Sequence, residues 1–91
     1  MSITNTKVTI LQTKSNLKAL ASITIDDCFV VHNLKIIQSD KGLFVCMPNK
    51  KMANGEYKDI AHPLNTQTRN DISSAVLTAY KKAIDENNFE M

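Results

Sequence analysis

The feature that most constrains this fold is the regular alternation in LKALASITID, residues 17–26. Every second position from Leu17 to Ile25 is apolar, and the positions between them are polar except for Leu20. A period of two is typical of a strand that buries one face and exposes the other. We therefore predict a sheet with a core on one side.

Three more segments have strand character, at residues 6–12, 28–38 and 43–47. Asp26-Asp27 offers a tight turn into residues 28–38, whose β-branched and aromatic residues on both faces indicate a central strand. Ser39 to Gly42 supplies the residues of another turn. Sequential strands joined by short turns predict an antiparallel meander. Pro48 ends the last of them, and residues 49–58 are predicted to form a polar loop around Asn54-Gly55.

From Thr68 onward the apolar period becomes helical. Thr68 and Asp71 have the spacing of a capping box. The apolar residues cover an arc of about 200°, which is wider than one sheet face covers and implies a second subunit. The residues of this arc are Ile72, Ala75, Val76, Leu77, Ala79, Tyr80, Ala83 and Ile84. The expected class is α+β, a twisted antiparallel sheet of about four to five strands with one C-terminal helix.

With 91 residues and 43% hydrophobic composition, the chain is predicted to form one domain, residues 1–84. Residues 85–91 are expected to be a flexible acidic tail. The N-terminus lacks the pattern of a signal peptide and no apolar run reaches the length of a membrane span, so we expect a cytoplasmic protein without membrane contact. Cys28 and Cys46 follow no disulfide framework and are expected to be reduced, buried thiols.

The sequence does not predict an enzyme, since no nucleophile or base lies beside residues that would activate it. Cys28, His32, Cys46 and His62 are possible soft ligands, but their spacing is not that of a metal site, so no metal or other cofactor is expected. We expect His32 in the core or an interface, and the His62 ring bonded to a backbone carbonyl or capping the turn. Neither glycine opens the helix, which argues against a phosphate cradle.

The net charge is only +2, but the cations are clustered. Lys50, Lys51 and Lys58 flank the predicted loop and Arg69 begins the helix, so a loop folded back on the helix start would form one phosphate-binding surface. The alternative is that these lysines only solvate a loop. Arg69 lies within the apolar arc and is also a candidate for an internal ion pair with Asp59.

Three stretches carry a family resemblance: ALASITIDDCFVVHNLKII, GLFVCMPNKK and GEYKDIAHPLNTQTRNDISSAVLTAY. In order and spacing they resemble the stage V sporulation protein G (SpoVG) family of small bacterial regulators. The resemblance implies the same sheet and helix, a homodimer, and binding of DNA or RNA in the control of gene expression, septation and sporulation. The nucleic-acid-binding residues that it implies are Lys50, Lys51, Lys58, Arg69, Lys81 and Lys82.

The chain departs from the family pattern at two of these positions. Lys51 and Lys58 stand where family members commonly have Arg, and lysine contacts phosphate as a point charge but reads guanine less well. A different class of function is also compatible with the resemblance. In that alternative the chain is a protein-interaction module at the division septum, which binds regulatory or division proteins through a strand edge or the helix flank.

Overall fold

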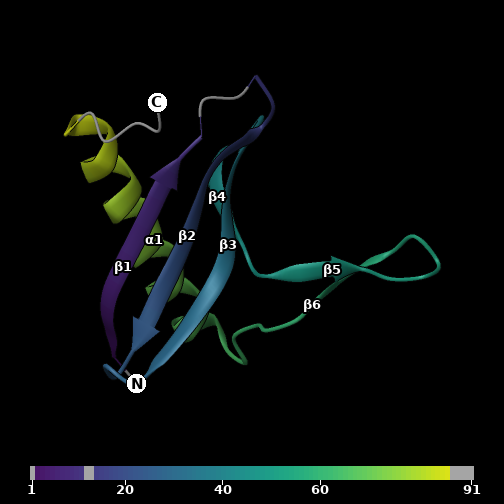
Figure 1. The fold of residues 1–91 in the computed structure, drawn as a ribbon, viewed down its shortest axis with the longest axis horizontal. Helices are drawn as coiled ribbons and strands as arrows, with labels where there is room; N and C mark the ends of the chain where they lie inside the picture. The colour runs from purple at the N-terminus through teal and green to yellow at the C-terminus, as the bar shows by residue number, and fades with distance from the viewer. Residues whose placement is uncertain (1, 12–13, 87–91) are drawn as a thin grey trace.

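The computed structural model describes residues 2–11 and 14–86. It contains a four-stranded antiparallel sheet with one helix across one face and a separate two-stranded hairpin (Figure 1). The main sheet consists of β1 (Ile3–Ile10), β2 (Leu17–Ile25), β3 (Phe29–Ser39) and β4 (Gly42–Cys46), which lie side by side in chain order. The predicted meander and the α+β class are confirmed.

The turn between β2 and β3 is as tight as the sequence predicted. Asp26 and Asp27 both have left-handed backbone angles, with φ of 51° and 57°, as the central residues of a type I′ turn do. The Cys28 amide donates to the Ile25 carbonyl at 3.0 Å. Ser2, which precedes β1, stabilises this turn, because its amide donates a hydrogen bond to Asp26 Oδ1 at 2.8 Å.

β3 is an inner strand along only part of its length. It pairs with β2 from Phe29 to Ile37, whereas β4 covers only Lys35 to Ser39. Within the part of the chain that the structure describes, residues 29–34 therefore have a free edge, and Phe29 is 64% exposed there. The prediction of a central strand is right for the second half of the segment and wrong for the first half, because β4 is too short to reach it.

The helix α1 (Thr66–Asp85) begins earlier than predicted. Its N-cap is Asn65, whose Oδ1 accepts from the Thr68 amide at 2.8 Å. The predicted capping box of Thr68 and Asp71 is wrong, because Thr68 already lies in the first turn as a donor to the cap. The helix ends at Asp85 with Glu86 as C-cap. Residues 87–91 of the predicted tail lie outside the described residues.

The core lies between α1 and one face of the main sheet. The helix contributes Ile72, Val76, Tyr80 and Ala83. The strands and the segment after β4 contribute Ile10, Ala19, Ala21, Ile23, Leu34, Ile36, Val45 and Met47. Leu77 is only half-buried and Ile84 is exposed, so part of the wide apolar arc is uncovered in the single chain. The second subunit inferred from that arc stays a prediction.

The prediction of buried thiols is wrong for Cys28, which is exposed in the β2–β3 turn, while Cys46 is half-buried. His32 is also exposed, outside the core. Among residues 2–11 and 14–86, no three potential metal-binding side chains gather. Within the same residues, α1 is not apolar enough to cross a membrane.

Candidate functional site

Residues 49–58, predicted as a loop, are largely a β-hairpin. Its strands are β5 (Asn49–Lys51) and β6 (Tyr57–Asp59). The Gly55 amide donates to the Met52 carbonyl at 2.9 Å, and Gly55 has a φ of 90° that a residue with a side chain rarely adopts. The loop prediction is wrong because short polar strands carry too few apolar residues to show a period of two.

The base of the hairpin is fixed to the end of the main sheet. Asn49 Nδ2 donates to the Met47 carbonyl at 3.1 Å, and the Ile60 amide donates to the Pro48 carbonyl at 2.7 Å. Beyond this base the hairpin extends away from both sheet and helix, as Figure 1 shows. All residues from Lys50 to Ala61 are exposed. The hairpin is therefore an arm whose base is anchored and whose two faces are accessible.

Two lysines lie directly opposite each other on this arm. In the register of β5 and β6, Lys50 pairs with Lys58. Directly opposed side chains of antiparallel strands have Cβ atoms about 5 Å apart, and like charges at that distance are destabilising. The two lysines share an open hollow with Met52, Asp59 and Ile60. An exposed arm with an unfavourable cation pair has the character of a site for an anion.

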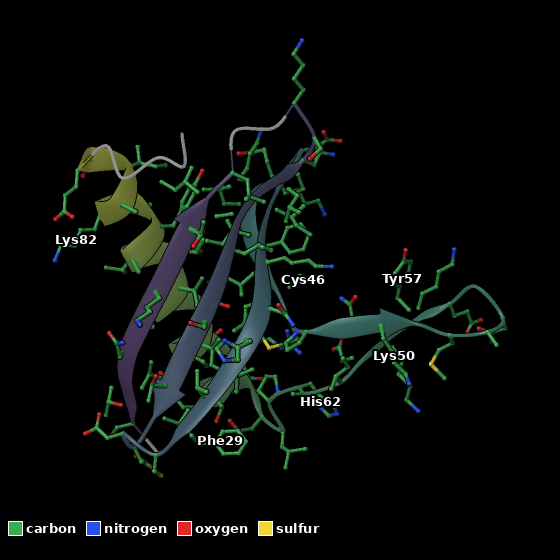
Figure 2. The ribbon with its side chains drawn as sticks, viewed as in Figure 1. Phe29, Cys46, Lys50, Tyr57, His62 and Lys82 are labelled. Carbon is green, nitrogen blue, oxygen red and sulfur yellow. The ribbon has the colours of Figure 1, made fainter. Side chains whose placement is uncertain are left out.

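The other register pairs of the hairpin are Lys51 with Tyr57 and Asn49 with Asp59. Lys51 thus lies beside an aromatic ring that is 69% exposed. Figure 2 shows Lys50 and Tyr57 on the arm, away from the body of the molecule. Tyr57 and Met52 are further candidate contacts on this arm that were not predicted from the sequence. The sequence feature that could have identified them is that both are large apolar residues inside an otherwise polar segment.

The structure does not place the other candidate cations on the hairpin. Arg69 is exposed in the first turn of α1 and, within the described ranges, forms no ion pair with Asp59. Lys81 and Lys82 are exposed near the C-terminal end of α1, about 20 Å along the helix from Arg69. Figure 2 shows Lys82 and Lys50 at opposite sides of the molecule. In one chain the six predicted residues thus form three separate groups.

His62 lies exposed in the segment that joins the hairpin to α1. Its Nδ1 is 3.2 Å from the Pro63 carbonyl oxygen, so the predicted contact of the ring with a backbone carbonyl is confirmed. The two histidines and two cysteines considered as ligands are spread over β3, the β2–β3 turn, the end of β4 and this segment. These four side chains therefore do not converge on one metal-binding centre.

Comparison with known proteins places this architecture in a family. The SpoVG family model matches residues 1–82. A protein of Lachnospira eligens is 52% identical over 83 residues, which cover 91% of this chain and 94% of that protein. A protein of Agathobacter rectalis is 47% identical over 85 residues, which cover 93% of this chain and 98% of that protein. Both carry the name "Putative septation protein SpoVG". The chain therefore belongs to the SpoVG family.

Proposed function

We propose that this protein binds nucleic acid, and that the β5–β6 hairpin is its main phosphate-binding element. The observation that carries the proposal is the register pair of Lys50 and Lys58 on an exposed arm. The repulsion of this pair is a cost to the free protein that a bound polyanion removes. Lys51 on the same arm adds a third cation.

The shape of the arm also supports the proposal. A two-stranded antiparallel ribbon has the width to enter the major groove of B-form DNA. Lysine side chains on such a ribbon contact phosphates and set orientation, whereas specific reading of guanine is more often done by Arg. We therefore expect backbone-dominated binding with weak sequence preference.

The proposed active form is a homodimer in the cytoplasm that acts in the control of gene expression, sporulation or septation. Phe29 and Val30 are exposed beside the free edge of β3, and Ile60 and Leu64 are exposed after the hairpin. A second copy that covers such apolar residues also doubles the number of hairpins. In one chain the candidate cations form separate groups. Dimerisation would bring Arg69, Lys81 and Lys82 of one copy onto the same phosphate-binding surface as the hairpin of the other.

The test is a salt titration of binding to a DNA duplex, with the native protein and with Lys50→Ala/Lys58→Ala. Removing two phosphate contacts reduces the slope of log K against log salt by about 1.8 for B-form DNA. The matched control is Lys14→Ala/Lys41→Ala, which removes two exposed lysines outside the hairpin. An affinity that is independent of salt, or equal slopes for the hairpin variant and the control, contradicts the proposal.

A second candidate is a protein-interaction module, which the free edge of β3 at residues 29–34 favours. An unpaired edge with exposed apolar side chains accepts an added strand from a partner. The relatives' name refers to septation, which is compatible with such a role. Affinity capture with and without nuclease separates the two candidates, since partners held through nucleic acid are released by nuclease.

A further inference from the structure

The main sheet has one covered face and one open face. Figure 1 shows α1 behind the sheet, and among residues 2–11 and 14–86 no helix or strand lies in front of the other face. The core residues occupy the positions of each strand that face α1, and the intervening positions form the open face. Cross-strand pairs place Thr9, Leu20, Lys35 and Cys46 in one row across all four strands of this face.

The charges of this sheet are of one sign. β1 to β4 contain no Asp or Glu, so all nine acidic residues of the chain lie outside these strands. The same strands carry Lys7, Lys18 and Lys35 at positions that alternate with the core residues. A face with three lysines and no carboxylate is complementary to a polyanion.

The open face also carries apolar side chains on β2, β3 and β4. Leu20 lies in the row of Lys35, and the next pair of β3 and β4 on this face is Ile37 with Phe44. Phe44, on the edge strand β4, is 45% exposed. Aromatic and aliphatic side chains flanked by lysines are the composition of surfaces on which unpaired bases stack. A duplex does not offer its base faces, so this composition favours a single strand.

A hollow that Leu20 also lines carries polar side chains. The hollow measures about 230 Å³, and its polar lining consists of Lys7, Thr9, Ser22, His32 and Asn33. Hydroxyl and amide groups of this kind both donate to and accept from a ribose 2′-hydroxyl. A second copy of this chain fits the face poorly, because two identical faces would oppose six lysines with no carboxylate between them.

From these observations we infer that the open face of β1–β4 is a binding platform for single-stranded RNA. Lys7, Lys18 and Lys35 contact phosphates, Phe44 and Leu20 contact bases, and the hollow beside His32 receives a ribose. A four-stranded sheet of this width accommodates about two or three stacked bases. The inference depends on the proposed function for its class of ligand, but the platform is separate from the hairpin.

The experiment measures the binding of an unstructured RNA of about ten nucleotides by fluorescence anisotropy, with a single-stranded DNA of the same sequence and a DNA duplex in parallel. Lys7→Ala/Lys35→Ala is expected to lower the RNA affinity about tenfold and to reduce the salt slope by about 1.4. Phe44→Leu keeps an apolar side chain but removes the ring, and it should lower the RNA affinity about fivefold. Lys14→Ala/Lys41→Ala is the matched control, and circular dichroism checks the fold of each variant.

The results that overturn the inference are distinct. RNA binding by the platform variants equal to that of the control overturns the platform, and an equal loss of duplex binding overturns its preference for single strands. Equal affinity for RNA and single-stranded DNA overturns the assignment of the ribose hollow. Conversion of a dimer to a monomer by Lys7→Ala/Lys35→Ala shows that a second copy covers the face. Loss of duplex binding in Lys50→Ala/Lys58→Ala remains a separate test of the hairpin.

Discussion

Asp27 holds a backbone conformation that glycine adopts more easily. It is the second central residue of the β2–β3 turn, with a φ of 57°, and glycine is strongly preferred at this position of type I′ turns. Its amide donates to Thr4 Oγ1 at 3.0 Å, so the turn also connects to β1 through the backbone. The contribution of Asp27 to stability therefore comes from its backbone and not from its carboxylate.

We predict that Asp27→Gly raises the free energy of unfolding by less than about 1 kcal/mol, because it relieves a left-handed conformation that costs a non-glycine residue about 1 to 2 kcal/mol while the greater freedom of glycine in the unfolded chain offsets part of the gain. Urea denaturation of the two proteins measures the difference. Asp27→Ala is the control and should lower stability, since alanine tolerates this φ less well than aspartate. Lower stability of the glycine variant would show that the side chain of Asp27 matters more than its backbone.

The start of α1 provides a second prediction, at the scale of the element. Asn65→Ala removes the acceptor for the Thr68 amide and should cost about 1 kcal/mol. Thr66→Ala changes an exposed residue at the first position of the helix and should cost much less. Thermal denaturation followed by circular dichroism compares the two. Equal effects would mean that the hydrogen bond from the Thr68 amide to Asn65 adds nothing to stability.

The hairpin is an element in which stability and the proposed function are opposed. Lys58→Glu places a carboxylate across from Lys50 and should stabilise the hairpin by about 0.2 to 1 kcal/mol. The same change should weaken DNA binding, because it replaces a cation with an anion. Amide hydrogen exchange at Met52 and Ile60, whose amides donate to backbone carbonyls, measures the first effect. Anisotropy measures the second.

Lys51→Glu is the matched control for that prediction, because Lys51 faces Tyr57 and gains no opposite charge across the strand. It should weaken binding without slowing hydrogen exchange. A Lys58→Glu variant that binds DNA as the native protein does would contradict the role of the register pair. Slower exchange in both variants would show that general charge, and not the pair, sets the stability of the arm.

At the scale of the whole molecule, the exposed apolar residues lead to a prediction about assembly. Ile60 is 66% exposed and Leu64 is 90% exposed, and both lie in the segment between the hairpin and α1. If a second copy covers them in the folded state, mass action makes the melting temperature rise with protein concentration. Scanning calorimetry over about a tenfold range of concentration measures this. A constant melting temperature contradicts the homodimer.

The sequence determined the order and character of the main elements. A period of two in residues 17–26 and a helical period after Thr68 follow from local geometry, so the presence of four sequential strands and a helix was predictable without tertiary contacts. The bounds were less predictable, since β1 begins at Ile3 and not at residue 6. The family resemblance followed in the same way from residue order. The cap at Asn65 was missed because several polar residues precede the helix, and local sequence does not decide which of them caps it.

Only the tertiary structure decided which of these residues act together. Alternation marks two faces of a strand but does not show that one face of the whole sheet is uncovered, which depends on where α1 packs. The pairing of Lys50 with Lys58 depends on how the turn at Gly55 closes the hairpin. The separation of Lys82 from Lys50, which Figure 2 shows, depends on the direction of the arm. Composition and order therefore determined which groups are present, while long-range contacts fixed the distances between them.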